Sequence, residues 1–396
     1  MTKRPPAGQP PRHADTEIVH LGRDPAGQHG FVNPPAYRGS TVLFPTLDAL
    51  EDYDNQVFKY GRHGTPTTAA LEEALCALEG GARTLLTASG YQAVTTAILA
   101  LVKAGDHVLM VDSVYQPTRK FCDSLLAKLG VETTYYDPLI GAGIAELMRP
   151  NTRVVFTESP GSLTFEMQDI AAISAVAHAR DAFVIMDNTW ATPYFFRALD
   201  HGVDVSVLAC TKYIVGHADA MLGAITANAR TAKLIEETRA TLGGCPGSEE
   251  AYLGLRGLRT LAVRLERHQR SGLEVARWLM DRPEVERVLH PALPSDHGHA
   301  LWAAQYGGAS GLFSIILKPA PRAAVAQMLD GLTLFGMGYS WGGFESLIIP
   351  FNPKRYRTAT RWTAEGPAFR LHIGLDDPRD LIADLDAGLA RLNAAL

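Results

Sequence analysis

Lys212 lies in a setting that lysine seldom occupies. It belongs to the segment Cys210-Thr211-Lys212-Tyr213, which follows the mostly apolar run Val203–Ala209 with few other charges nearby. Partial burial lowers the pKa of an amine, and such an amine can form a Schiff base with a carbonyl group and later carry a proton. A lysine that extends its head to the surface would show the same pattern, so this residue by itself leaves both interpretations open.

Two other polar sites follow apolar runs. Asp187 ends the run Phe183–Met186, and Ser89-Gly90-Tyr91 follows the run Thr84–Ala88 and opens a helix. A buried carboxylate needs a partner, such as a protonated ring nitrogen, and the free N–H groups of a helix start can bind a phosphate. Each site also has a purely structural interpretation, as a capping or turn aspartate and as an ordinary strand-to-helix turn.

The combination of these three sites is more informative than each alone. Ligands of parallel sheets bind beyond the carboxyl ends of the strands, and all three sites are expected at such ends. The phosphate turn, the ring-nitrogen carboxylate and the amine follow one another in the order that a single cofactor would need. We therefore expect pyridoxal 5'-phosphate to be the cofactor.

The elements around these residues predict an α/β protein. Short apolar runs alternate with helix-like stretches and indicate a mostly parallel sheet covered by helices; the runs are His107–Val111, Val131–Tyr136, Val154–Thr157, Phe183–Met186 and Val203–Ala209. We expect a mobile tail over 1–15, an arm in subunit contacts over 16–60, a cofactor domain over 61–250 and a smaller α/β domain over 251–396. The arginine-rich stretch Tyr252–Leu279 resembles one connecting helix, and Leu381–Leu392 a terminal one.

Composition narrows the classes of partner. The 396 residues are 46% hydrophobic and 20% charged, with a net charge of -5, and the charges are interspersed, so we expect no nucleic-acid partner. No window approaches the roughly 18 apolar residues of a membrane span. The four cysteines lack a C-x-x-C pair, which favours a reducing cytoplasm.

Two further motifs could suggest a metal site or a dinucleotide-binding site, but neither has the required pattern. The histidines of the segment His290–His299 have no helical i, i+4 pair, so we expect no metal site. Gly336-Met337-Gly338 begins like a dinucleotide fingerprint but does not continue as one.

The segments ACTKYIVGHADAMLG and VIMDNTW resemble the cysteine/methionine-metabolism family of pyridoxal-phosphate enzymes, and the resemblance runs from about Thr16 to the C-terminus. It implies the aspartate aminotransferase-like fold type I, with Lys212 as Schiff base and proton carrier and Asp187 as partner of the ring nitrogen. It also implies a homo-oligomer, namely a dimer with shared sites that pairs into a tetramer.

The same resemblance implies roles for other residues. Ser89, Gly90, Tyr91 and Thr211 would bind the phosphate, and Tyr115 would stack on the ring and act as a second catalytic group. Tyr60 and Arg62 would reach the phosphate from the neighbouring subunit, with Tyr60 also near the substrate. Arg370 would grip the substrate carboxylate, with Ser340 and Trp341 beside it. The chain departs from the family's pattern at two positions. At Tyr91 the family more often has a smaller residue, and at Cys210 we interpret the cysteine as a small packing residue.

Two segments bear on the reaction. Within the resembled family, enzymes that act at the γ-carbon usually differ at Trp341 and over the stretch ESPGSLTFEM. The resemblance therefore implies β-elimination of cystathionine to homocysteine, pyruvate and ammonia, a step of methionine biosynthesis. The alternatives within the family are a γ-synthase, a sulfhydrylase-type transferase, and a lyase of cystine or other cysteine S-conjugates. A regulatory protein that only binds the cofactor would be expected to lose part of the catalytic set, which is present.

Overall fold

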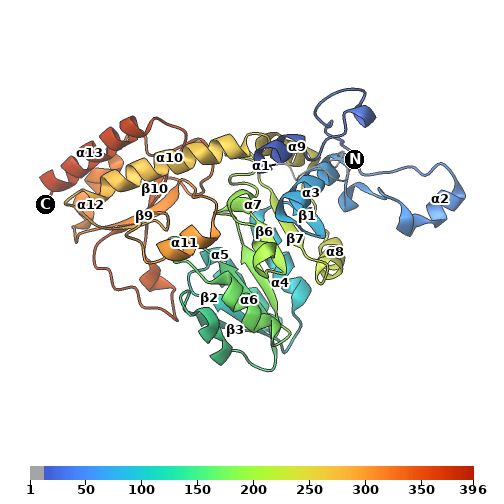
Figure 1. The fold of residues 1–396 in the computed structure, drawn as a ribbon, viewed down its shortest axis with the longest axis horizontal. Helices are drawn as coiled ribbons and strands as arrows, with labels where there is room; N and C mark the ends of the chain where they lie inside the picture. Colours follow the sequence, from blue (N-terminus) through green and yellow to red (C-terminus); the bar gives the residue numbers. More distant parts are fainter. Residues whose placement is uncertain (1–12) are drawn as a thin grey trace.

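The computed structural model describes residues 13–396, which form two domains and an N-terminal arm (Figure 1). Residues 1–12 of the predicted tail lie outside the described part. The predicted tail also includes Ala14 and Asp15, which begin helix α1 (Ala14–His20) in the structure. The side chain of Ile18 in this helix is buried against the large domain, because its apolar surface is removed from water there.

The large domain is built on a seven-stranded sheet in the described part of the chain, with the order β1-β7-β6-β5-β4-β2-β3. The strands are β1 (Arg83–Thr87), β2 (His107–Val111), β3 (Glu132–Tyr136), β4 (Thr152–Glu158), β5 (Phe183–Asp187), β6 (Val205–Leu208) and β7 (Gly223–Ala227). Strands β2 to β6 pair in parallel, while β7 is antiparallel to both β1 and β6. The predicted mostly parallel α/β fold is confirmed.

Helices cover the sheet, and their ends follow sequence signals. Helix α3 begins at Pro66 after a Thr65 capping box and ends at Gly80, which adopts a left-handed conformation. The α-helices of this domain are α3 (Pro66–Glu79), α4 (Gly90–Leu101), α5 (Gln116–Phe121), α6 (Ile170–His178), α7 (Thr192–Phe195) and α8 (Ala232–Thr241). A π-helix (Cys122–Leu126) extends α5.

The predicted single helix over Tyr252–Leu279 is wrong. The chain forms α9 (Ser248–Leu258) and α10 (Leu261–Met280), with a break at Arg259-Thr260. At the break, the N–H and the hydroxyl of Thr260 both donate to the carbonyl of Gly257. Helix α9 and the start of α10 pack against α3, whereas the last turns of α10 belong to the core of the small domain. Helix α10 thus bridges the two domains (Figure 1).

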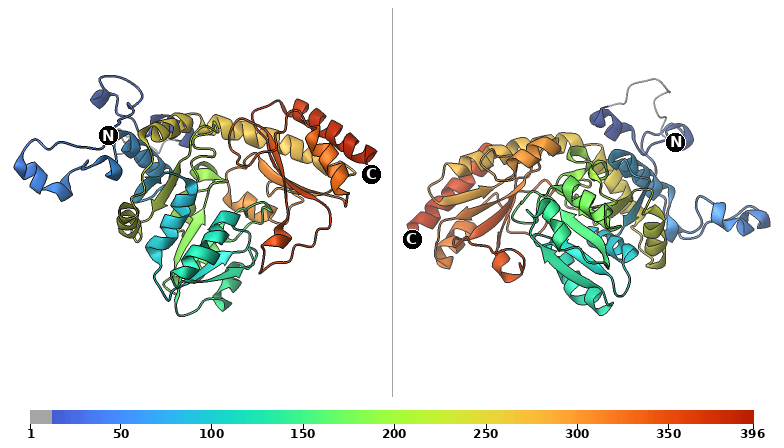
Figure 2. Two further views of the ribbon diagram at one scale, coloured as in Figure 1. Left: turned by 180° about the vertical axis from the view of Figure 1, so that it is seen from behind. Right: turned by 60° about the horizontal axis from the view of Figure 1, so that its bottom comes forward.

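The small domain contains a four-stranded antiparallel sheet in the order β10-β11-β9-β8. Its elements are β8 (Val285–Leu289), α11 (His299–Gln305), β9 (Leu312–Leu317), α12 (Arg322–Asp330), β10 (Leu347–Phe351), β11 (Ala368–His372) and α13 (Pro378–Ala394). Helix α13 packs against both α10 and α12, and α10 also packs on strands β8 and β9 (Figure 2). Short 3-10 turns connect elements at 26–28, 53–55, 61–63, 141–146, 198–201 and 353–355.

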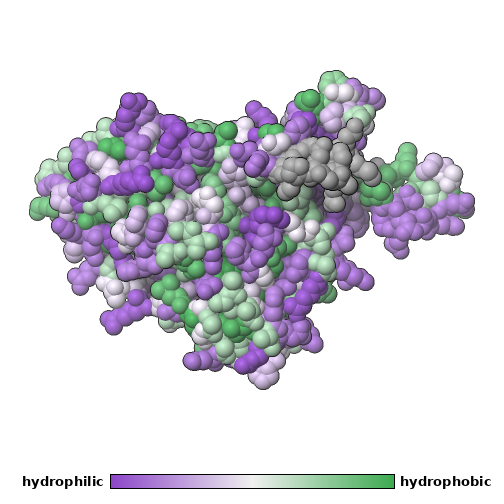
Figure 3. Space-filling model, in the orientation of Figure 1, coloured by the Kyte–Doolittle hydropathy of each residue, from purple (hydrophilic) through white to green (hydrophobic). Residues whose placement is uncertain are grey.

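The N-terminal arm extends away from the large domain (Figures 1 and 2). It carries helix α2 (Leu47–Glu51) and exposes several large apolar side chains, of which Phe31, Leu43 and Val57 are 73%, 87% and 86% exposed. In the hydropathy view, hydrophobic residues are visible on this projection beside hydrophilic ones (Figure 3). Apolar surface on a projecting segment is typical of an interaction surface.

Candidate active site

A cavity of about 450 Å³ lies at the carboxyl ends of β4, β5 and β6, and residues of the small domain also line it. All predicted site residues except Tyr60 and Arg62 line it, namely Ser89, Gly90, Tyr91, Tyr115, Asp187, Thr211, Lys212, Ser340, Trp341 and Arg370. The topology therefore brings together strand ends and a loop that are up to 281 positions apart, from Ser89 to Arg370.

Lys212 lies in the turn after β6, and its amine enters the cavity. Nζ donates a hydrogen bond to Ser340 Oγ at 2.5 Å and lies 5.4 Å from the ring centroid of Trp341. Burial and the nearby charge of Arg370 lower the pKa of Lys212 from 10.5 to about 8, although Asp187 opposes the change. At neutral pH roughly a tenth of an amine with this pKa is uncharged, far more than for an ordinary lysine, and the uncharged form is the one that acts as nucleophile and base.

Asp187 ends the central strand β5. Its Oδ1 atom accepts hydrogen bonds from the N–H of Thr189 at 3.0 Å and from the Thr189 hydroxyl at 2.6 Å. Burial raises the pKa of Asp187, while the Thr189 hydrogen bonds and the charge of Lys212 oppose this. A cation on the cavity side, such as a protonated ring nitrogen, would stabilise the carboxylate further.

The N-terminus of α4 supplies main-chain donors. Ser89 Oγ caps the helix by accepting from the N–H of Gln92, and the N–H groups of Gly90 and Tyr91 lie in the first turn, where no intrahelical acceptor exists. A Cβ atom on Gly90 would lie 2.4 Å from that of Ala209. Glycine therefore lets the helix start approach the end of β6, which directs its donors and its positive dipole end at the cavity.

The hydroxyl of Thr211 is already engaged within the chain. It donates to the carbonyl of Leu222 at 3.1 Å and accepts from the N–H of Leu222 at 2.9 Å. A hydroxyl contact to a phosphate would have to replace the bond to this carbonyl. The phosphate-binding role of Thr211 stays a prediction.

Arg370 lies on β11 and lines the cavity. One Nη2 hydrogen bond, 2.9 Å long, goes to the carbonyl of Ser340, while its buried Nε has no partner among the described residues. Burial lowers the pKa of Arg370 to about 10, so the guanidinium keeps its charge at neutral pH. A donor without a partner beside the cavity is suited to a carboxylate ligand.

Glu158 is a site residue that the sequence reasoning did not single out by itself. It ends β4 opposite Asp187 of β5 in the sheet register, and its Oε2 accepts the N–H of Tyr115 at 2.8 Å. Burial and the neighbouring Asp187 raise the pKa of Glu158 well above 4.5. The signal that found Asp187, a carboxylate directly after an apolar strand, would have found Glu158 too.

Tyr60 and Arg62 lie outside the cavity of their own chain. The guanidinium carbon of Arg62 lies 5.7 Å from the centroid of the Tyr60 ring, and the carbonyl of Arg62 accepts from Arg239 on α8 at 3.3 Å. Both residues follow the projecting arm. Their predicted reach into a neighbouring site is not tested by a single chain and stays a prediction.

The donor set fits pyridoxal phosphate. Helix-start N–H groups suit the phosphate, the buried Asp187 suits a protonated ring nitrogen, and the Lys212 amine suits the aldehyde. Each of the three groups lines the same cavity.

This arrangement defines a pyridoxal-phosphate enzyme, and the comparisons specify its family. The chain belongs to the Cys/Met metabolism PLP-dependent enzyme family, whose model matches residues 15–390. It is 46% identical to cystathionine beta-lyase MetC of Escherichia coli K12, over 96% of this chain and 98% of that protein. It is 41% identical to an L-alanine/L-glutamate racemase of Wolbachia pipientis wMel, over 95% and 96% of the two chains.

Solved structures agree with this assignment. The cystathionine gamma synthase of Xanthomonas oryzae pv. oryzae, solved with aminoacrylate and cysteine, superposes with a TM-score of 0.90 at 31% identity, over 98% of this chain and 100% of that one.

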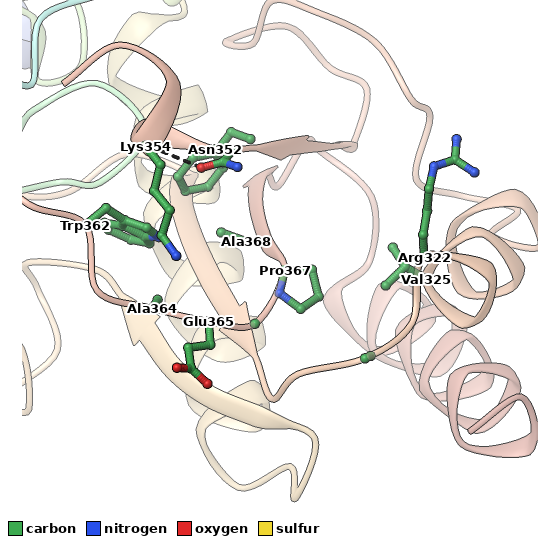
Figure 4. Close-up of a pocket in the computed structure, with 12 residues that line it drawn as sticks. Arg322, Val325, Asn352, Lys354, Trp362, Ala364, Glu365, Pro367 and Ala368 are labelled. Atoms are coloured by element: carbon green, nitrogen blue, oxygen red, sulfur yellow. Dashed lines mark hydrogen bonds between the residues drawn. The ribbon is translucent and has the colours of Figure 1, made fainter.

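A second hollow of about 300 Å³ lies in the small domain and shares no lining residue with the first. Lys354, Trp362 and Glu365 line it, and the N–H of Lys354 donates to Asn352 (Figure 4).

Within residues 13–396, no cluster of three or more His, Cys, Asp or Glu side chains is arranged to hold a metal ion. No helix in this range has the length and apolar character needed to cross a bilayer.

Proposed function

We propose that this enzyme is a carbon–sulfur lyase that cleaves cystathionine by β-elimination to homocysteine, pyruvate and ammonia. The observation that carries the proposal is the single cavity lined by Lys212, Asp187, Arg370 and Trp341. The similarity to the Escherichia coli protein named cystathionine beta-lyase supports the choice of substrate.

Each residue has a distinct task in this proposal. Bound pyridoxal phosphate supplies an electron sink for the negative charge that develops at the α-carbon. Arg370 binds the α-carboxylate and thereby orients the substrate. The Lys212 amine removes the α-proton, and the same amine or Tyr115 returns a proton to the departing sulfur. Asp187 holds a proton on the ring nitrogen.

Trp341 and Lys212 together favour β-elimination over γ-elimination. γ-Elimination requires a second proton to be removed from the β-carbon, so the substrate must be free to present that carbon to the base. The amine is held between Ser340 Oγ at 2.5 Å and the Trp341 ring centroid at 5.4 Å. An amine fixed in this way favours one deprotonation followed by direct loss of the thiol.

Product identification tests the proposal. The purified enzyme, loaded with cofactor and given cystathionine, is expected to form pyruvate and homocysteine, and Lys212→Ala is expected to form neither. Formation of 2-oxobutyrate and cysteine as the main products would overturn the β-elimination proposal. Added thiol or sulfide acceptors distinguish the γ-synthase and sulfhydrylase alternatives, and cystine tests the wider range of substrates.

Amino-acid racemisation is a second candidate function. It is favoured by the similarity to the Wolbachia protein named L-alanine/L-glutamate racemase, and it needs an acid that can return the α-proton to the other face of the substrate. Tyr115 lines the cavity, and burial together with Glu158 raises the pKa of its hydroxyl, so it holds a proton at neutral pH. D-Alanine formed from L-alanine above the level of Lys212→Ala, measured by chiral chromatography, would support this function.

We further propose a dimer with shared sites, which pairs into a tetramer. Support comes from the apolar arm and from Tyr60 and Arg62, which lie outside the cavity of their own chain. Mixing inactive Lys212→Ala with inactive Arg62→Ala should restore activity, because one site of a mixed dimer is then intact. Lack of recovery despite confirmed subunit exchange would contradict sharing, and light scattering gives the number of chains.

We also propose a cytoplasmic location. The four cysteines support it, because they form no C-x-x-C pair and all four are free thiols in the described structure. Fractionation of cells with an antibody against the chain tests the location.

A further inference from the structure

The loop that carries Ser340 and Trp341 adopts an unfavourable backbone conformation beside Lys212. Ser340 has a φ of 87°, a value that L-residues avoid because the Cβ atom approaches backbone oxygens. Gly342 has a φ of 85°, and a Cβ atom there would lie 2.9 Å from the Cα atom of Lys212. The loop is thus pressed against the main chain of the lysine, and surrounding contacts must hold it there.

Strand β11 fastens this loop at three positions. Arg370 donates to the carbonyl of Ser340, as described above. His372, two residues further along and therefore on the same face of the strand, accepts the N–H of Gly342 on Nε2 at 3.0 Å. Its Nδ1 donates to the carbonyl of Glu345 at 2.9 Å.

These partners define the protonation state of His372. A carbonyl oxygen can only accept and a main-chain N–H can only donate, so the ring is neutral with its proton on Nδ1. Burial, with a smaller contribution from His268, lowers the pKa of His372 well below 6.5. The rings of Tyr213 and His268 lie 6.2 and 5.3 Å from the His372 ring, between centroids, and restrict its rotation. The ring therefore presents a fixed acceptor to Gly342.

We propose that His372 is a positioning residue of the active site: its Nε2 atom holds Gly342 in place and thereby keeps the Ser340 hydroxyl against the Lys212 amine. His372 does not line the cavity itself, so it acts through the loop. Loss of the bond would release the strain at Ser340 and let its hydroxyl move away from the amine. The inference deepens the proposed lyase function and rests on it for the kinetic part of its test.

Two substitutions separate the hydrogen bonds of the ring. The side-chain amide of His372→Gln reaches the position of Nε2 and can still accept from Gly342. That of His372→Asn reaches only the position of Nδ1 and leaves the buried Gly342 N–H without an acceptor. The matched control is His290→Asn, because His290 is a buried histidine of the small domain whose Nδ1 accepts from Ala292, a bond that asparagine can keep.

We expect His372→Asn to lower kcat/KM for cystathionine about tenfold or more, as the loss of one buried hydrogen bond implies, with more of the loss in kcat than in KM. His372→Gln and the control should stay within about threefold of the unchanged enzyme. Amide hydrogen exchange over residues 339–345, measured with cofactor and without substrate, should rise in His372→Asn alone. This second readout does not depend on which substrate the enzyme uses.

The two readouts decide the inference together. Equal effects of His372→Gln and His372→Asn, or unchanged loop exchange in His372→Asn, would overturn it. Gly342→Ala provides an independent variant if His372→Asn does not fold, since the new Cβ atom pushes the loop away from Lys212. It should reproduce the loss in kcat and the faster exchange, and normal values in this variant would also overturn the inference.

Discussion

The carboxylate of Asp112 connects the two domains and offers a sharp test of the structure. It is fully buried just after β2 and pairs with Arg119, whose side chain is 5% exposed. It also accepts the N–H groups of Thr358, Ala359 and Thr360 at 3.0, 3.1 and 2.8 Å and the Thr360 hydroxyl at 2.6 Å. The loop between β10 and β11 is thus fastened to the segment that leads to Tyr115.

Asp112→Ala leaves a buried guanidinium and three main-chain donors without their acceptor. Removing one partner of a buried ion pair costs about 3–5 kcal/mol. An unfolding entropy of about 2.1 cal/mol/K per residue over 396 residues gives roughly 0.8 kcal/mol/K. We therefore expect the apparent melting temperature to fall by about 4–6 °C, and by less in Asp112→Asn, which keeps one acceptor oxygen.

Thermal unfolding followed by circular dichroism at one scan rate measures this effect. The control is Glu237→Ala, which breaks a surface ion pair with Lys233. The side chains of Lys233 and Glu237 are 86% and 62% exposed, so we expect the melting temperature to change by less than about 1 °C. The double variant Asp112→Ala/Arg119→Ala should lose less than the two single variants summed. A melting temperature of Asp112→Ala equal to that of the control would refute the reasoning.

The same carboxylate predicts a pH dependence. Burial raises the pKa of Asp112, but the hydrogen bonds from Thr358, Thr360 and Ala359 outweigh burial and hold it below 3.8. A lowered folded-state pKa stabilises the fold above the unfolded value, and this contribution is lost as the pH falls through the folded value. The difference in melting temperature between the unchanged enzyme and Asp112→Ala should therefore persist down to about pH 4 and shrink below it.

Three further outcomes are expected. Lys212→Ala should lose both turnover and the yellow absorption of lysine-bound cofactor, and an active variant would contradict the assignment. Arg370→Lys should raise KM for cystathionine about tenfold or more, because an ammonium cannot bind the carboxylate in a bidentate way; initial rates measure this. Burial raises the pKa of Glu79 from 4.5 to about 7, so its protonated form stabilises the fold below about pH 4.5, and this contribution is lost as the pH rises toward 7. Glu79→Gln should therefore stabilise the fold at pH 8 by up to about 3 kcal/mol, which corresponds to a rise of up to about 4 °C in the melting temperature, and should have little effect at pH 4.5.

Much of the large domain could be predicted from the sequence because buried parallel strands are short apolar runs. The residues that end such runs, Asp187 and Lys212, were identified for that reason, and they do line one cavity. The sequence does not predict strand β7, since GAITA contains mostly small residues that carry little strand signal. The sequence does not predict the break between α9 and α10, because the apolar spacing continues across it.

The tertiary structure decided which distant segments meet. The family resemblance places Arg370 near Ser340 and Trp341, but nothing in the local sequence places His372 against the loop from Ser340 to Glu345, since this contact depends on how β11 pairs with β9 and β10. The lowered pKa of Lys212 has the same origin, because burial by the small domain and the charge of Arg370 are both nonlocal. Sequence determined the chemical groups and the ends of most elements through local periodicity and capping. Only the folded chain determined their distances and their desolvation, since both depend on residues that lie far apart in sequence.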